Sequence, residues 1–339
     1  MKTSAFDYQL PAERIAQQPL EPRDSSRLLV LDRRTGRVQH TIFRRLPDFL
    51  NPNDLLVINR SRVVPARIFG RKRPGGGRVE LLLLERLDDR RWKALVGGKG
   101  LSPGKRIELQ DDLAATIEAD LGEAQRLIAF DRPVDRELER LGSVPLPPYI
   151  HTALADPERY QTVYAREPGS AAAPTAGLHF TPVLMEAIRS RGARFAELTL
   201  HIGLDTFAPV NEEDPRAHLI HTEWCQLTAA AAGQVNATRT AGGRVVAVGT
   251  TSVRVLETAA RLREDREVAP YEGRTDLFII PGYKFAAVDA LLTNFHLPRS
   301  TLLMLVSAFA GRELILETYR EAIAEGYRFY SFGDAMLIL

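Results

Sequence analysis

Short apolar runs, each interrupted after a few residues, fill the stretch of the chain from residue 66 to 130. Gly, Pro and Asp-Asp breaks separate these runs, and the spacing predicts an antiparallel β barrel or sandwich. The runs expected to form its strands are 78–84, 91–96, 106–109, 114–119 and 125–130. Three prolines between residues 141 and 149 favour extended backbone, so we predict that this module ends there.

On either side of this stretch, strand-like and helical patterns alternate, which predicts α/β layers. A hairpin is expected at 27–31 and 38–43, and a helix capped by Thr181 is expected to reach about residue 191. Further strands are expected at 55–58, 194–201, 244–248, 276–280, 328–331 and 335–339, and helices at 226–239, 252–263, 300–310 and 313–325. The predicted fold is therefore α/β multidomain. We expect residues 1–60 and 150–339 to form an α/β layered catalytic domain, and residues 61–149 to form an inserted small antiparallel β-barrel domain.

Composition narrows the class of protein. The 339 residues are about twice the usual domain length, and 45% hydrophobic with 26% charged residues excludes wholesale disorder. The single cysteine, Cys225, cannot close an intrachain disulfide, which fits a reducing compartment. Residues 1–10 lack a secretion signal, and the longest near-apolar run, 301–310, is about half a bilayer span. We expect a cytoplasmic monomer without a membrane partner.

Basic residues gather in one part of the chain. Residues 60–110 contain 14 Lys and Arg against 5 Asp and Glu, whereas the whole chain has a formal charge of only +2. Such clusters supply the sequence-independent attraction to phosphates that nucleic-acid binders use. An ordinary solvated barrel surface has the same composition, and this alternative stays open. The residues predicted to contact RNA are Arg60, Arg62, Arg67, Arg71, Lys72 and Arg73.

A turn rich in hydroxyl groups, residues 249–252, joins a predicted strand to a predicted helix. Open α/β sheets bind ligands at this end of their strands, where the helix also offers free N–H groups. An ordinary helix cap has the same sequence, and neither a Walker loop nor a dinucleotide fingerprint is present. The small-residue loop 170–178 allows close approach of backbone to a ligand, although a linker has a similar composition.

Four histidines, at 179, 201, 221 and 296, fall at strand ends or in loops, where an imidazole can transfer protons near neutral pH. Each one alone is more typical of a structural hydrogen-bonding residue. The pair at 218 and 221 has no third ligand at a suitable spacing, so we predict no metal site. Asp334 is an alternative base, although an aspartate in a turn is usually structural.

Several longer sequence motifs occur in a fixed order. They are 160–165 (Tyr-Gln-Thr-Val-Tyr-Ala), 169–181, 249–254 (Gly-Thr-Thr-Ser-Val-Arg) and 293–304 (Thr-Asn-Phe-His-Leu-Pro-Arg-Ser-Thr-Leu-Leu-Met), with shorter matches at 6–8, 59–67, 146–150 and 327–336. Together they resemble the S-adenosylmethionine:tRNA ribosyltransferase-isomerases of queuosine biosynthesis. The resemblance spans nearly the whole chain.

The resemblance implies an activity. The family moves the ribosyl part of S-adenosylmethionine onto 7-aminomethyl-7-deazaguanine at the tRNA wobble position, which gives epoxyqueuosine tRNA and releases adenine and methionine. It implies that tRNA and S-adenosylmethionine are the partners, and that the latter is a consumed donor, so no cofactor is expected. It also implies an α/β domain with an inserted β barrel. Two other functions stay open, a tRNA base methyltransferase that uses S-adenosylmethionine and a non-catalytic RNA-binding module.

With this activity in view, we predict the donor pocket and the proton-transfer groups. Hydroxyls and N–H groups at a helix N-terminus suit ribose hydroxyls or the methionine carboxylate, and an arginine could add a charge-assisted contact. The predicted donor-binding residues are Gly249, Thr250, Thr251, Ser252 and Arg254, with Thr175 and Gly177 of the small-residue loop across from them. The predicted catalytic residues are His296 and His179, then His201 and His221, with Asp334 as the alternative carboxylate.

Overall fold

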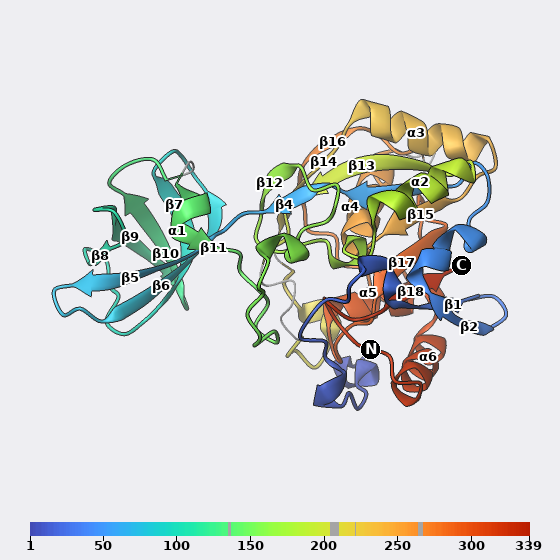
Figure 1. Cartoon of the computed structure of the whole chain (residues 1–339), viewed down its shortest axis with the longest axis horizontal. Helices are drawn as coiled ribbons and strands as arrows, with labels where there is room; N and C mark the ends of the chain where they lie inside the picture. Colours follow the sequence, from blue (N-terminus) through green and yellow to red (C-terminus); the bar gives the residue numbers. More distant parts are fainter. Residues whose placement is uncertain (135–136, 204–209, 221, 264–266) are drawn as a thin grey trace. The chain divides into compact units, whose positions relative to one another are not determined.

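The computed structural model describes residues 1–134, 137–203, 210–220, 222–263 and 267–339. The chain divides into two compact units (Figure 1). The first unit, called the α/β unit below, comprises 1–62, 148–167 and 173–339. The second, the barrel unit, comprises 63–147 and 168–172. The predicted fold class, α/β layers with an inserted antiparallel barrel, is confirmed.

A nine-stranded mixed sheet forms the centre of the α/β unit, in the order β16-β14-β13-β3-β15-β17-β18-β1-β2. Strands β13, β3, β15 and β17 run parallel to one another, and β18 runs antiparallel to β17. The bounds are β1 Arg27–Leu31, β2 Val38–Ile42, β3 Leu55–Asn59, β13 Arg194–Leu200, β14 Glu223–Leu227, β15 Val245–Val248, β16 Tyr271–Thr275, β17 Ala290–Asn294 and β18 Ala335–Ile338. Parallel neighbours bring their carboxyl ends to one edge of the sheet.

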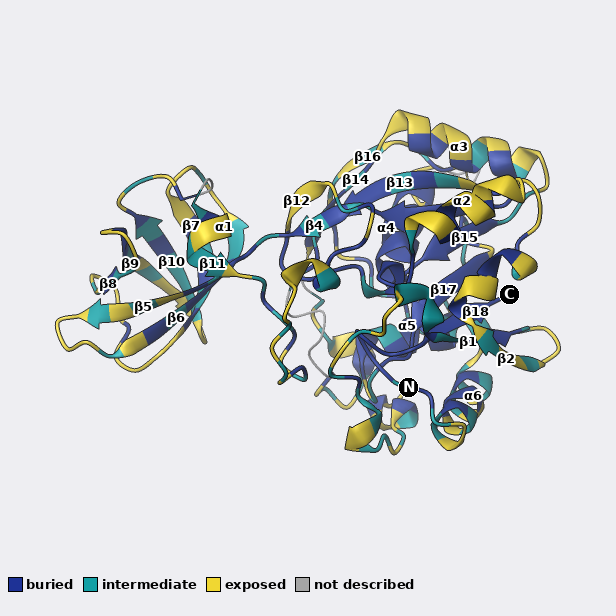
Figure 2. Ribbon diagram, in the orientation of Figure 1, coloured by how far each residue is buried: buried dark blue, intermediate teal, exposed yellow. Residues whose placement is uncertain are grey.

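Both faces of this sheet are covered. Val246 and Val248 of β15 belong to one core cluster with Leu184 and Ile188 of helix α2. Their neighbours Val245 and Ala247 point to the other face and are also buried, where helices α3 and α4 contact the strands. The helices are α2 Pro182–Ser190, α3 Ala229–Thr240, α4 Thr250–Ala260, α5 Thr301–Ala310 and α6 Arg312–Ala324. Figure 2 shows the buried strands and the exposed outer side of α3.

The barrel unit is a closed six-stranded antiparallel barrel. Its strands follow the order β5-β6-β7-β10-β9-β8, and β8 pairs back with β5 to close the ring. The bounds are β5 Arg67–Arg73, β6 Arg78–Arg86, β7 Arg91–Gly97, β8 Arg106–Glu108, β9 Ala114–Gly122 and β10 Gln125–Phe130. Short elements complete the structure: α1 Leu138–Leu141, β11 Gly142–Ser143, and the pair β4 Ser61–Val63 with β12 Glu167–Ser170.

Three predicted elements are wrong in the described part of the chain. The strand expected at 276–280 is instead the more polar β16, which pairs with β14. Residues 328–331 do not form a strand, because Tyr330 has a positive φ of 74° that interrupts extended backbone. The helix expected from residue 226 starts at Ala229, since the residues before Thr228 belong to β14. No helix among the described residues has the length and apolar character needed to cross a membrane.

Candidate functional site

The carboxyl ends of β15 and β17 create a hollow at one edge of the sheet. The two strands are parallel neighbours, and helix α4 starts directly after β15 through Gly249. Gly249 has a φ of 88°, a left-handed conformation that side chains other than glycine adopt only with strain. Its amide N–H donates to the Leu292 carbonyl on β17, which fixes the turn against the neighbouring strand.

The first turn of α4 is left open on the side of this hollow. Gly249 provides no side-chain cap, and the Ser252 hydroxyl donates backward to the Val248 carbonyl. The Thr251 side chain is nearly buried, at 8% exposure, and its Oγ1 atom has no hydrogen-bond partner among the described residues. A buried hydroxyl without a partner is unfavourable in the free protein, so a ligand with a polar group there gains affinity.

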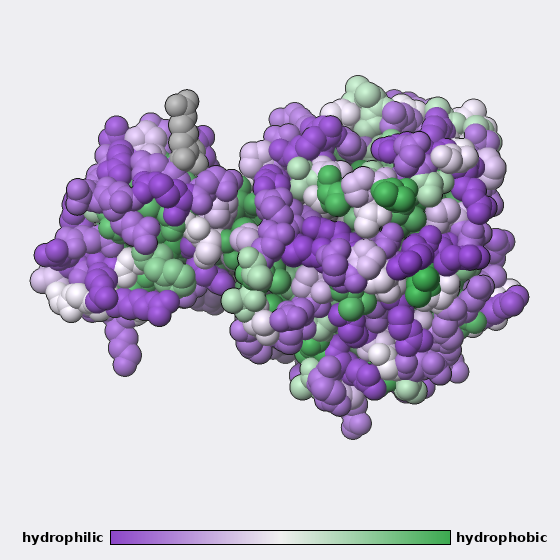
Figure 3. Space-filling model, in the orientation of Figure 1, coloured by the Kyte–Doolittle hydropathy of each residue, from purple (hydrophilic) through white to green (hydrophobic). Residues whose placement is uncertain are grey.

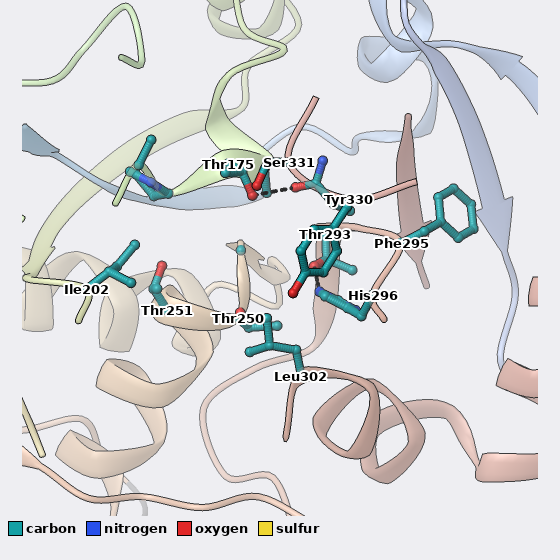
Figure 4. Close-up of a pocket in the computed structure, with 15 residues that line it drawn as sticks. Thr175, Ile202, Thr250, Thr251, Thr293, Phe295, His296, Leu302, Tyr330 and Ser331 are labelled. Atoms are coloured by element: carbon teal, nitrogen blue, oxygen red, sulfur yellow. Dashed lines mark hydrogen bonds between the residues drawn. The ribbon is translucent and has the colours of Figure 1, made fainter. Parts of the chain in front are cut away.

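The hollow encloses about 490 Å³, which includes open solvent at its mouth. We call it the sheet-edge hollow. Figure 4 shows side chains from several segments around it, with the hydroxyls of Thr251 and Tyr330 pointing into the space. Its lining residues are Ala173, Pro174, Thr175, Ala176, Ile202, Gly249, Thr250, Thr251, Thr293, Asn294, Phe295, His296, Leu302, Tyr330 and Ser331. None of them carries a carboxylate, an ammonium or a guanidinium group.

His296 is the predicted catalytic residue that lines the sheet-edge hollow. Its Nε2 atom lies 3.2 Å from Thr293 Oγ1, and its Nδ1 atom lies 3.2 Å from Tyr319 Oη. The side chain is almost completely buried, and this desolvation lowers the pKa of His296 to about 3. The imidazole is therefore neutral at pH 7 and has one lone pair that can accept a proton.

His179 lies one side chain away from the sheet-edge hollow. The Asn294 amide donates to His179 Nε2 at 3.2 Å, so the ring proton is on Nδ1 and faces Ser26 Oγ at 2.7 Å. Asn294 Oδ1 accepts from the Thr175 hydroxyl at 3.0 Å, which completes a chain of hydrogen bonds into the hollow. Burial, and then the charges of Arg328 and Arg23, lower the pKa of His179 to about 3.

The other predicted proton-transfer groups lie elsewhere. His201 stacks on Trp224 with ring centroids 5.0 Å apart, and burial lowers the pKa of His201. Asp334 accepts hydrogen bonds from the main-chain N–H groups of Arg27 and Arg328, one on each carboxylate oxygen, which is a structural role. His221 lies outside the described residues.

Arg254 is held away from the sheet-edge hollow. It forms a buried ion pair with Glu223 of β14, and its Nε donates to the Leu277 carbonyl at 3.0 Å. The other Glu223 oxygen accepts from the Gly203 N–H at 3.0 Å, directly after Ile202 of the lining. Arg254 therefore positions the wall of the hollow through Glu223 and does not contact its interior.

The seven predicted donor-binding residues divide into two groups. Four of them line the hollow: Gly249, Thr250, Thr251 and Thr175. Ser252, Arg254 and Gly177 do not. Gly177 instead allows close packing against Tyr164. A Cβ atom at this position would lie 2.0 Å from the Tyr164 hydroxyl, too close for any side chain.

Residues that the sequence reasoning missed provide much of the lining. Thr293 and Asn294 end the buried strand β17, which the sequence analysis did not predict. Recognition of that strand would have placed both side chains at the carboxyl edge beside the 249–252 turn. Tyr330 and Ser331 had no comparable signal, since they lie in the segment wrongly expected to be a strand.

The residues predicted to bind RNA are held by different kinds of partner. Arg67 pairs with Glu80 and Arg73 with Glu108, whereas the Arg71 and Lys72 side chains donate to main-chain carbonyls. In the α/β unit, the remaining two are also paired: Arg60 with Glu167 and Glu197, and Arg62 with Glu158.

The barrel as a whole is nearly neutral. Residues 63–147 contain 16 Lys and Arg and 14 Asp and Glu, because 111–147 contain 9 Asp and Glu against 4 Lys and Arg and offset most of the basic charge before them. Hydrophilic side chains cover most of the barrel face visible in Figure 3. Any attraction to phosphates therefore depends on which part of the barrel surface faces them.

Fold and hollow together define an α/β protein with an inserted β barrel and a hollow at the carboxyl edge of its sheet. The chain matches the queuosine biosynthesis protein family over residues 3–338. It belongs to this family.

Individual relatives agree with this assignment. The chain is 57% identical over 343 residues to the S-adenosylmethionine:tRNA ribosyltransferase-isomerase of Symbiobacterium thermophilum, and 52% identical over 340 residues to that of Thermotoga maritima, with 100% of each chain covered. A crystal structure of S-adenosylmethionine tRNA ribosyltransferase from Thermotoga maritima is 43% identical, with a TM-score of 0.58, and the match covers 99% of this chain and 100% of that chain.

Proposed function

We propose that this chain is an enzyme that transfers and isomerises the ribosyl group of S-adenosylmethionine onto 7-aminomethyl-7-deazaguanine at the wobble position of tRNA. The products are epoxyqueuosine tRNA, adenine and methionine. Membership of the queuosine biosynthesis family supports this reaction class. The structural observation that carries the proposal is the sheet-edge hollow, where the buried Thr251 hydroxyl has no partner among the described residues.

The sheet-edge hollow suits the donor. The open first turn of α4 offers N–H groups and two threonine hydroxyls to a carboxylate or to ribose hydroxyls. The sulfonium is a cation, and the Tyr330 ring, which points toward the space while the Phe295 ring points away from it, is an aromatic surface that can face this cation. The apolar side chains of Ile202 and Leu302 line part of the hollow and disfavour water beside charged intermediates.

His296 is the proposed proton carrier. The sulfonium acidifies the hydrogens on the neighbouring ribose carbon, and the neutral imidazole accepts one of them as the ribose ring opens. The imidazolium that forms is strongly acidic because the buried site disfavours its charge. It then returns the same proton to departing adenine, so one histidine serves as base and then as acid.

The aminomethyl nitrogen of the acceptor base then attacks the opened sugar and gives up a proton. A carbon–carbon bond closes the five-membered ring, and closure of the epoxide breaks the carbon–sulfur bond and expels methionine. Asn294 and Thr175 hold fixed hydrogen-bonding directions at the hollow and can orient the sugar hydroxyls. The barrel residues Arg67, Arg71, Lys72 and Arg73, with Arg60 and Arg62, remain the proposed contacts to tRNA outside the hollow. We further propose that the enzyme acts as a cytoplasmic monomer.

Product analysis tests this function. Purified enzyme is incubated with S-adenosylmethionine and tRNA that carries 7-aminomethyl-7-deazaguanine, and small molecules and digested nucleosides are separated by mass spectrometry. We expect adenine and methionine in equal amounts, together with epoxyqueuosine in the tRNA. A matched tRNA with unmodified guanine lacks the nucleophile, and we expect no modified nucleoside from it. S-adenosylhomocysteine with methylated tRNA would instead establish the methyltransferase alternative.

A further inference from the structure

Three arginine side chains surround a second hollow in the α/β unit. This hollow has a volume of about 270 Å³ including its mouth. Its lining residues are Pro19, Leu20, Arg23, Ser26, Arg159, Leu178, His179, Arg328, Ser331, Phe332 and Gly333. We call it the arginine hollow. A guanidinium presents several N–H donors in one plane, which matches the oxygens of a phosphate or a carboxylate.

The arginine hollow shares a wall with the sheet-edge hollow. Ser331 lines both of them. His179 lines the arginine hollow and accepts a hydrogen bond from Asn294, which lines the sheet-edge hollow. One layer of side chains therefore separates a group bound in one hollow from a group bound in the other.

The inner part of the arginine hollow has positive charge in excess. Within the described part of the chain, Arg23 donates its hydrogen bonds to the main-chain carbonyls of Gln161, Leu178 and Glu158. These bonds hold the guanidinium in place without neutralising it. His179 is neutral and adds no charge, but Arg328 and Arg23 both act on its pKa, so their charges converge on this space.

The carboxylates around the arginine hollow offset only part of the positive charge of its arginines. The buried Asp334 carboxylate lies 3.7 Å from Arg328 and offsets its charge, which leaves Arg23 without a buried carboxylate among the described residues. Arg159 pairs with Glu21, whose side chain is 76% exposed. Glu158 pairs with Arg62 and is 59% exposed, and Asp156 caps the turn at Glu158. Exposed carboxylates are screened by solvent and salt far more than the guanidinium groups behind them.

We propose that the arginine hollow binds a backbone phosphate of the tRNA nucleotide whose base is modified, with Arg23, Arg159 and Arg328 as the binding residues. This inference rests on the proposed function. A nucleotide that places its base against the donor carries its phosphate one sugar away, and the arginine hollow lies one side-chain layer from the donor site. The methionine carboxylate is the competing anion, but the open turn of α4 already offers it N–H groups inside the sheet-edge hollow.

Steady-state kinetics with Arg159→Gln and Arg328→Gln test this site. We expect the KM for tRNA to rise about 10- to 100-fold for each variant, because each loses a charge-assisted contact. The KM for S-adenosylmethionine should stay within twofold. The dependence of log Kd for tRNA on log salt should become shallower by about one phosphate contact per variant. Arg159→Lys and Arg328→Lys keep the charge but lose the planar fork, so we expect intermediate effects.

Arg37→Gln is the matched control. Arg37 is exposed in the turn between β1 and β2, at the opposite edge of the sheet, and we expect its removal to leave both constants unchanged. Circular dichroism and thermal midpoints establish that the variants fold. An increase confined to the KM for S-adenosylmethionine, or no change in either constant, would overturn the phosphate site. If the parent enzyme bound tRNA but released no adenine, the proposed function would fail, while the tRNA affinities would still test the arginines.

Discussion

Two ion pairs, one in each unit of this protein, lie in opposite environments. In the α/β unit, Arg254 and Glu223 form an ion pair whose side chains are only 5% and 4% exposed. In the barrel unit, Arg73 and Glu108 form a pair of the same chemical type with side chains 66% and 42% exposed. Water solvates the barrel pair whether or not it forms, whereas a carboxylate left alone in the α/β unit has no such alternative.

The same contrast separates the two kinds of proposed site. The sheet-edge hollow is lined by neutral groups whose positions depend on buried contacts behind them, such as Glu223 behind Ile202. The charged side chains on the barrel surface are exposed, and the position of each one depends little on buried contacts behind it. Substitutions near the hollow should therefore cost stability or catalysis, and substitutions on the barrel should cost only affinity.

The largest expected effect is on stability, from Arg254→Met. This substitution leaves the Glu223 carboxylate buried without its cation, and we expect a loss of about 3 to 5 kcal/mol of unfolding free energy in urea titrations. Arg73→Met in the barrel should cost less than about 1 kcal/mol. The double variant Arg254→Met/Glu223→Leu should recover most of the loss. If Arg254→Met lowered the unfolding free energy by less than about 1 kcal/mol, the buried and the exposed ion pair would contribute equally to stability, which would contradict this comparison.

A catalytic effect nearly as large is expected from His296→Asn. The variant keeps a polar side chain but removes the proposed proton carrier, so single-turnover adenine release should fall about 100-fold or more. His201→Asn is the control, because His201 stacks on Trp224 outside the lining and should stay within threefold of the parent. Adenine release within threefold of the parent for His296→Asn would rule out the role proposed for it.

Acid should weaken the α/β unit more than the barrel. Burial lowers the pKa values of His179 and His296 to about 3, below the ordinary value near 6.5. Between these values the unfolded chain binds more protons than the folded chain, so stability falls as the pH drops below about 6.5. Each histidine contributes about 1.4 kcal/mol per pH unit. Residues 63–147 contain no histidine, so the barrel lacks this contribution.

Urea titrations from pH 7 to pH 5 measure this slope, above the range where most carboxylates titrate. His296→Asn should remove about 1.4 kcal/mol per pH unit from the slope of the α/β unit. Hydrogen exchange of barrel amides over the same range reports on the barrel separately. An equal pH slope for both units would contradict the burial of neutral imidazoles as its cause.

Much of the fold could be predicted because local pattern and tertiary structure agree. Five of the six barrel strands, the β1–β2 hairpin and the Thr181 cap, whose hydroxyl accepts from the Leu184 N–H, follow from signals within a few residues, whereas β5 was not predicted. Strand β17 has five buried residues without alternation, and so short an apolar run is ambiguous between strand and helix. β16 was missed because it is a polar strand at the sheet edge, and its pairing with β14 depends on residues far away in sequence.

Residues of the candidate site could be predicted only where they come directly after a predicted strand. The turn at Gly249 met that condition, and three of its residues line the hollow. The direction of a long side chain could not be predicted: Arg254 turns to Glu223, and nothing local in the sequence specifies that partner. The charge of the barrel was overestimated because the count stopped at residue 110, whereas residues 111–147 of the same unit contain 9 Asp and Glu against 4 Lys and Arg.

Thr251→Val should produce a smaller, specific effect in the sheet-edge hollow. Valine fills the same volume but lacks the hydroxyl that has no partner in the described structure. We expect the KM for S-adenosylmethionine to rise about 5- to 10-fold, the value of one hydrogen bond, with the tRNA constants unchanged. Ser252→Ala is the neighbouring control, because its hydroxyl already donates to Val248. It should lower stability without changing the KM, and equal increases for both variants would assign the effect to helix α4 as a whole.

The smallest effects are expected on the barrel, where they distinguish local contacts from overall charge. Arg71 and Lys72 donate to main-chain carbonyls and can turn to a phosphate without breaking an ion pair, whereas Arg67 and Arg73 already hold Glu80 and Glu108. Arg71→Gln or Lys72→Gln should weaken tRNA binding about fivefold and reduce the salt dependence by about one contact. Arg67→Gln and Arg73→Gln should have less effect on either quantity. Equal effects of all four would point to net charge alone, and the absence of any effect would remove the barrel from the tRNA interface.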